Sequence, residues 1–254
     1  MKSTIYSILI AIASLEGIKR QAFIIILAAI IFAFFYYYIP YRRLIRKIKK
    51  YGNSLSNVKK ETRQRIKEMK AYVRSKGYRL FYITRNKSNI NGNSFFKGLI
   101  TIDGDWYKPA YQLNRREWII AQWSTICHEL GHKDNEPKGY NFAFTKDKIF
   151  VNYVREVRAD LYAKRKLIYE FRYPTCDIMK AYALKCQDNK KDYSDGTHPS
   201  WNFRLAILEK YDWLNEEVIY LIADEVGLDH TNKAVVEMLD WYRQNDAKRV
   251  IQFN

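Results

Sequence analysis

The sequence predicts an α+β protein that is mostly helical, with a small β-sheet above a long helix and a transmembrane anchor in front. Three observations predict this class. A long uncharged apolar segment lies near the N-terminus, short aromatic-rich segments with strand character follow, and helical periodicity dominates the second half. The chain has 254 residues, so enough remains after the anchor for one domain with a sizeable core.

The apolar segment at residues 21–39 carries no formal charge and is rich in Ile, Phe, Ala and Tyr. At about 1.5 Å per residue, a helix of this length is about long enough to cross a hydrocarbon core of roughly 30 Å. Tyr36, Tyr37 and Tyr38 gather at its far end, as in the aromatic belt at a membrane interface. We therefore predict a membrane span at 21–39, with a helix buried in a protein core as the alternative.

Residues 4–15 are also apolar but too few for an ordinary span. They could form the first arm of a hairpin, re-enter the membrane or lie on it. A cleavable signal peptide is a weaker option, because residues 21–39 would remain. The prediction is a membrane anchor at 1–40 with one or two spans. The cations that follow Pro40 place the rest of the chain on the cytoplasmic side.

Positive charge is concentrated directly after the predicted anchor. Residues 41–90 hold 17 of the 44 Lys and Arg but two of the 27 Asp and Glu, so most of the net charge of +17 lies there. Beside a membrane, each cation near anionic headgroups contributes about 1 kcal/mol. We predict a basic juxtamembrane helical segment at 41–77 whose residues 41–76 contact such lipids. Nucleic-acid binding is the less favoured alternative, because no recognition motif accompanies the charge.

The segment His128-Glu129-Leu130-Gly131-His132 lies in a helix predicted over 117–133. Two imidazoles four residues apart share one helix face, about 6 Å apart, and can bind one metal ion. The H-E-x-x-H pattern is typical of zinc hydrolases, in which the His pair binds zinc and the Glu is the general base. Gly131 fits a place where another backbone or a substrate comes close. The alternative is a surface helix with two solvated histidines.

A third ligand is expected from the helix predicted over 151–171, which carries Glu156 and Asp160. Catalytic zinc usually takes three protein groups and leaves a fourth position to water, and Glu156 completes such a set. Asp160 lies one turn later, where it can accept the second ring N–H of a ligand His. The alternative is a pair of helix-surface acids bound by Arg155, Arg158 or Lys164. We predict one Zn²⁺ ion.

These residues resemble a known group of enzymes. The H-E-x-x-H segment at 128–132, followed by Glu156 and Ala159-Asp160, is similar to the gluzincin metallopeptidases, and within them to the CAAX prenyl proteases and bacterial HtpX-like proteases. Residues 91–102 resemble the family's Asn-Ala-Phe stretch and the strand after it, although Ser94 replaces the Ala. His198-Pro199 with Arg204 resembles its late His-Pro…Arg motif. The resemblance covers roughly residues 78–210.

The resemblance implies a zincin-like catalytic domain at 78–254 and a membrane-anchored zinc endopeptidase. Glu129 would take the proton of the attacking water and pass it to the leaving amine. His198 is the candidate for a second electrophilic partner, and Arg204 would brace Glu156 or the fold. His198 could instead cap the helix that follows Pro199.

The expected substrate is a protein or peptide. Residues 78–83 and 99–102 read as short strands, and an extended peptide could add to the edge of such a sheet. Residues 175–187, 201–211, 215–226 and 231–247 read as helices that pack behind the site, and the loop 188–199 brings His198 towards it. A catalytically silent binding protein at the membrane surface is the alternative function. The complete set of residues for hydrolysis favours the enzyme.

Overall fold

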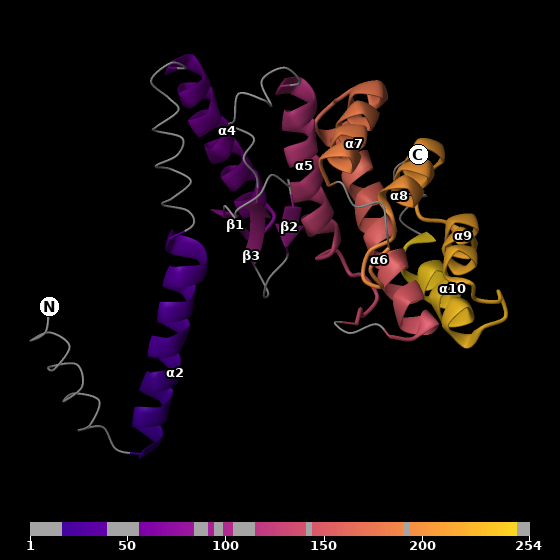
Figure 1. The fold of residues 1–254 in the computed structure, drawn as a ribbon, viewed down its shortest axis with the longest axis horizontal. Helices are drawn as coiled ribbons and strands as arrows, with labels where there is room; N and C mark the ends of the chain where they lie inside the picture. Colours follow the sequence, from indigo (N-terminus) through magenta and orange to yellow (C-terminus); the bar gives the residue numbers. More distant parts are fainter. Residues whose placement is uncertain are drawn as a thin grey trace, which may run out of the picture.

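The computed structural model describes residues 17–39, 56–83, 91–93, 99–103, 115–140, 144–189 and 194–247. Helices make up most of this described chain (Figure 1). In chain order they are α2 (Gly17–Ala33), the π-helix η1 (Phe34–Tyr38), α4 (Ser56–Ser75), α5 (Arg115–Gly131), α6 (Lys146–Arg165), the π-helix η3 (Lys166–Glu170), α7 (Thr175–Asn189), α8 (Trp201–Lys210), α9 (Glu216–Val226) and α10 (Lys233–Asn245).

The predicted membrane anchor is not found. Among the described residues, no helix combines the length and apolar character needed to cross a membrane. Helix α2 has 17 residues and is thus about 26 Å long, short of a hydrocarbon core of roughly 30 Å, and the chain changes to a π-helix at Phe34. The predicted span at 21–39 and the single- or double-span membrane localisation built on it are therefore wrong. Residues 4–15 lie outside the described residues.

Among the described residues, strands form three short segments, β1 (Arg79–Ile83), β2 (Asn91–Asn93) and β3 (Leu99–Asp103). Their order is β1-β3-β2, with β1 parallel and β2 antiparallel to β3. Strands β2 and β3 pack against α5. The predicted fold class, an α+β domain behind a transmembrane anchor, is contradicted as a whole. The described chain is mostly helical and lacks the anchor, because the apolar N-terminal segment forms too short an α-helix.

The second half of the chain is built from well-delimited helices. Helices α5 to α10 begin and end within a few residues of the predicted ranges, except for α6, which starts earlier, at Lys146, and changes to the π-helix η3 at Lys166. Side-chain oxygens of Ser200, Asn215 and Asn232 accept hydrogen bonds from the first-turn N–H groups of α8, α9 and α10. Helix α9 ends at Gly227, whose φ of 71° suits a residue without a side chain. Local capping thus sets these boundaries.

An aromatic cluster fixes one side of α5. Trp123 of α5 packs on Tyr72 of α4 and on Phe171, with ring centroids 5.4 and 4.4 Å away. Cys127, one turn further along the same side, is fully buried, and this burial raises the pKa of its thiol to about 12. The thiol is therefore an inert core group. Helix α4 and Phe171, the residue that follows η3, therefore pack against this side of α5.

Candidate metal centre

The two histidines of α5 meet at one point. The Nε2 atoms of His128 and His132 lie 3.0 Å apart, and the two rings are nearly perpendicular. His128 is buried and His132 is largely so. The spacing of one helical turn accounts for this meeting, since residues four apart share a helix face. Their ring nitrogens can therefore bind the same ion.

Glu156 of α6 brings a carboxylate to the same point. Its Oε2 lies 3.3 Å from Nε2 of His128, and its Oε1 lies 3.3 Å from Nε2 of His132. One ligand atom from each of the three residues lies within 4.8 Å of the others. The group His128, His132 and Glu156 could therefore hold a metal ion.

A close helix contact makes this geometry possible. A Cβ placed on Gly131 would lie 3.0 Å from the Cα of Ala159 and 3.3 Å from its Cβ. Only a residue without a side chain lets α5 approach α6 so closely. The sequence predicted that another backbone or a substrate comes close to Gly131, and the structure shows the backbone of Ala159 there. Gly131 precedes His132 directly, and Ala159 lies about one turn after Glu156, so the close contact is next to both ligands.

Carboxylates form hydrogen bonds with the outer nitrogen, Nδ1, of both histidines. Nδ1 of His128 lies 2.8 Å from Oδ1 of Asp160, the contact predicted from the sequence. Nδ1 of His132 lies 2.8 Å from Oε2 of Glu136. Because an ionised carboxylate can only accept, each Nδ1 donates, and Nε2 of each neutral ring turns a lone pair towards the centre. Both rings are thus in the tautomer that binds metal.

Glu136 is a site residue that the sequence reasoning missed. It follows the end of α5, beyond Asn135, which has a φ of 50°. Burial would raise the pKa of Glu136, but hydrogen bonds from His132 and Arg155 lower it, so the carboxylate stays charged. The sequence feature that could have predicted this contact is an acid four residues after a ligand His. It was not used because the helix was predicted to end at residue 133, before Glu136.

Arg204 of α8 neutralises the outer carboxylate. Its Nε and Nη2 donate to the two oxygens of Asp160 at 2.6 and 2.8 Å, whereas Nη2 lies 3.8 Å from Oε2 of Glu156. Burial would raise the pKa of Asp160, but Arg204 and His128 hold it well below its usual range. Arg204 therefore braces Asp160 first and Glu156 only secondarily. The sequence reasoning had assigned it to Glu156 or to the fold.

The buried electrostatics fit a metal ion. Oε2 of Glu156 is buried and has no hydrogen-bond partner. Its nearest neighbour, Nε2 of His128, is an acceptor in the tautomer set by Asp160, so the 3.3 Å approach is not a hydrogen bond. Burial lowers the pKa of His132, but the charge of Glu156 and the hydrogen bond to Glu136 outweigh it and raise the pKa to about 10. The centre thus favours a positive charge, which the protonated His132 ring carries in the metal-free chain and which a metal ion would supply when it displaces that proton.

Glu129 lies beside these ligands, one residue after His128. Its side chain is buried, with 5% of the residue exposed. Burial is the main reason why the pKa of its carboxyl is raised, and the neighbouring histidines partly oppose this. A carboxyl with a raised pKa is a better proton acceptor when ionised than an exposed one. This environment suits the predicted general base.

Lys185 of α7 is a second residue that the sequence reasoning missed. Its ammonium is buried, lies 3.4 Å from Oγ of Ser124 and rests near the rings of Tyr182 and Trp201. Burial lowers its pKa to about 8, although the charges of Asp160 and Glu129 partly counter this. No local pattern could reveal it, because the packing of α7 on α5 creates its environment.

His198 lies at the open side of the centre. Its Nε2 is 3.7 Å from Oε1 of Glu156, and its side chain is 52% exposed. Asp195 holds the residue from behind by accepting from the His198 backbone N–H at 2.7 Å. Ser200, not His198, caps α8, because its Oγ accepts from N–H of Phe203. The capping alternative for His198 is thereby replaced by a position next to the ligands.

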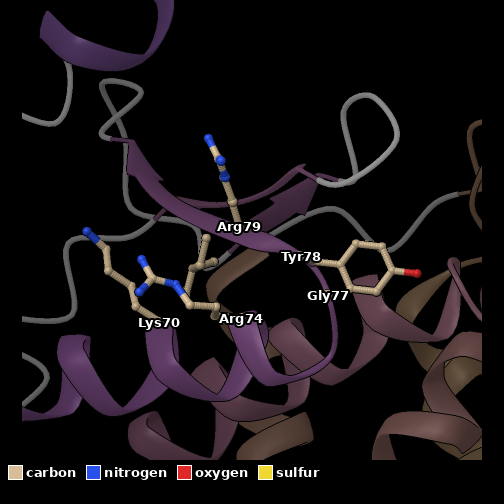
Figure 2. A pocket seen from close by; sticks show the side chains of 6 residues that line it. Lys70, Arg74, Gly77, Tyr78 and Arg79 are labelled. Atoms are coloured by element: carbon tan, nitrogen blue, oxygen red, sulfur yellow. The ribbon is translucent and has the colours of Figure 1, made fainter.

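A hollow of about 550 Å³ lies between α4 and β1. Figure 2 shows Lys70 and Arg74 on the helix and Arg79 pointing away from it, so these cations do not converge on one point. The predicted contact of residues 41–76 with anionic lipids falls partly outside the described residues. That contact stays a prediction, as does the low expectation of nucleic-acid binding.

No model of a known protein family, no characterised protein and no solved structure matches this chain. The resemblance to the gluzincins therefore rests on the motif residues alone. The geometry of the centre has to carry any functional conclusion.

Proposed function

We propose that this chain is a zinc-dependent peptidase, with His128, His132 and Glu156 as the zinc ligands. The observation that carries the proposal is the convergence of these three donors within 4.8 Å, with the outer nitrogen of each His bound to a carboxylate. Two imidazoles and one carboxylate are a ligand set of catalytic zinc, which leaves a position for water. The motif resemblance to the gluzincins supports the same assignment. The membrane-anchored part of the predicted function is not retained.

When bound, zinc would lower the pKa of a water molecule and stabilise negative charge on a peptide carbonyl oxygen. Glu129 takes a proton from the attacking water and gives it to the nitrogen of the leaving amine. Asp160 and Glu136 hold the ligand rings in place during both transfers. The pKa of His198 is raised because Glu156 and Asp195 outweigh the effect of burial, so its Nε2–H can donate to the developing oxyanion.

The test compares the full-length parent with Glu129→Gln, both loaded with zinc, on fluorescein-labelled casein. We expect the variant to retain zinc and to lose cleavage by about 10²- to 10⁴-fold, because Gln cannot accept the water's proton. Glu237→Gln is the matched control, since Glu237 is exposed on α10 and its ion pair in the described part of the chain is with the likewise exposed Lys233. Equal cleavage by parent and Glu129→Gln would contradict the mechanism. A zinc-loaded parent that cleaves no casein would favour a catalytically silent binding protein.

A further inference from the structure

Gln122 is buried on α5 without any hydrogen bond from its amide. Only 1% of the residue is exposed, and both its Nε2 and its Oε1 lack a partner. Among the described residues, no other Asn or Gln side chain is buried in this state. A buried amide with no partner is unfavourable for folding, and such a group calls for an explanation. Nothing in the metal centre described above uses it.

The helix geometry places Gln122 on the same face as Glu129. The two residues are two helical turns apart, roughly 10 Å along the axis. Gly131 and Ser124 lie on the opposite face of α5. Gly131 packs closely against Ala159 of α6, and Ser124 lies next to Lys185 of α7. The other elements that pack on α5 include β2 and β3, and the strands lie between α4 and α5 (Figure 1). Gln122 is therefore on the side of α5 turned away from Gly131 and Ser124, and so from the contacts of these two residues with α6 and α7.

A primary amide matches the main chain of a peptide, since each presents one donor and one acceptor side by side. This protein already contains such a pair. Oδ1 of Asn152 accepts from the backbone N–H of Tyr140 at 2.9 Å, and its Nδ2 donates to the Tyr140 carbonyl at 2.9 Å. Gln122 offers the same two atoms with no partner in place.

We propose that the Gln122 amide binds the main chain of the peptide substrate about three residues from the bond that is cut. This inference rests on the proposed peptidase function. The distance follows because an extended chain rises about 3.3 Å per residue, and roughly 10 Å separates Gln122 from Glu129. Gln122 is covered in the peptide-free chain, so a substrate must displace part of that cover. Because Gln122 would contact only the main chain of the substrate, binding there should not depend on the substrate's side chains. It should require a substrate long enough to reach Gln122 from the cleaved bond.

The experiment uses the zinc-loaded full chain, with a peptide taken from its own casein digest as the probe. The peptide is synthesised at full length and truncated to two residues on each side of the cleaved bond. For Gln122→Leu we expect unchanged zinc content and a melting temperature raised by about 2–4 °C, because an unpaired amide is removed. We also expect KM for the full-length peptide to rise about tenfold with kcat unchanged, and no effect on the truncated peptide.

Gln244→Leu, at an exposed position of α10, is the control and should change none of these quantities. If Gln122→Leu lowers the melting temperature, or changes KM equally for both peptides, the amide is a structural group and the inference is overturned. If the zinc-loaded parent cleaves no casein, the proposed function and this inference fall together.

Discussion

At the scale of single residues, Asp160 connects the metal centre to the rest of the fold. Its two oxygens bind His128 on one side and Arg204 on the other, and the residue is 1% exposed. The sequence predicted the contact with a ligand His, because helical spacing places Asp160 one turn after Glu156. It did not predict that Arg204 binds Asp160 bidentately. That contact depends on how α8 packs on α6, which spacing within one helix does not reveal.

Removal of Arg204 should leave the buried charge of Asp160 without compensation. We expect Arg204→Leu to lower the free energy of unfolding by roughly 3–5 kcal/mol and to weaken metal binding about 10- to 100-fold. Denaturant titration and competition with a chelator measure the two effects. Arg243→Leu is the control, because Arg243 also donates twice to a carboxylate, that of Glu216, but on the exposed surface. Similar losses of stability in both variants would contradict the role assigned to burial.

Lys185 should make the stability of the protein depend on pH. Burial lowers its pKa from 10.5 to about 8, so between these values the unfolded chain binds the proton and the folded chain does not. The free energy of unfolding therefore rises with pH across this window. We expect Lys185→Met to be the more stable variant at pH 7 and to lose this advantage as the pH approaches 10. Denaturation midpoints measured in parallel test this, and a constant difference between variant and parent would contradict it.

At the scale of secondary-structure elements, the pairing of α5 with α6 builds the site. The sequence predicted both helices, and their ligand residues, from periodicity and motif spacing. It could not predict the loop after α5, where Arg158 donates to the carbonyls of Gly131 and Asp134 and fastens that loop to α6. Glu136 is brought to His132 by the same loop. Helical periodicity therefore predicts the positions of residues within a helix but not those in the loop that follows it.

Gly131→Ala tests the close approach of these helices. On helix propensity alone the change should stabilise a helix interior by about 1 kcal/mol. The added Cβ would lie 3.0 Å from the Cα of Ala159, so we expect a loss of about 1–3 kcal/mol instead, together with weaker zinc binding. The double variant with Ala159→Gly removes one of the three close contacts, that with the Ala159 Cβ, and should recover part of the loss. A more stable Gly131→Ala variant would show that the helices can separate without cost.

At the scale of the whole molecule, helices from the C-terminal third complete a centre whose ligands lie earlier in the chain. Arg204 of α8 binds Asp160, and Asp246, which follows α10, accepts from Nε of Arg158 at 2.6 Å. The sequence predicted these helices but not their contacts, which join residues far apart in the chain. The main error of the sequence-based prediction also belongs to this scale, because the predicted membrane anchor at residues 21–39 is not found. Hydropathy over residues 21–39 did not show that the α-helix stops at Ala33.

The most direct test of the account is the zinc content of the purified full chain, measured by elemental analysis beside Glu156→Ala and the exposed control Glu237→Ala. The account predicts about one zinc per chain in the parent and the control and almost none in Glu156→Ala, because two histidines alone leave the ligand set incomplete. A folded parent that takes up no zinc after resupply, or a Glu156→Ala variant that holds as much as the parent, would contradict it.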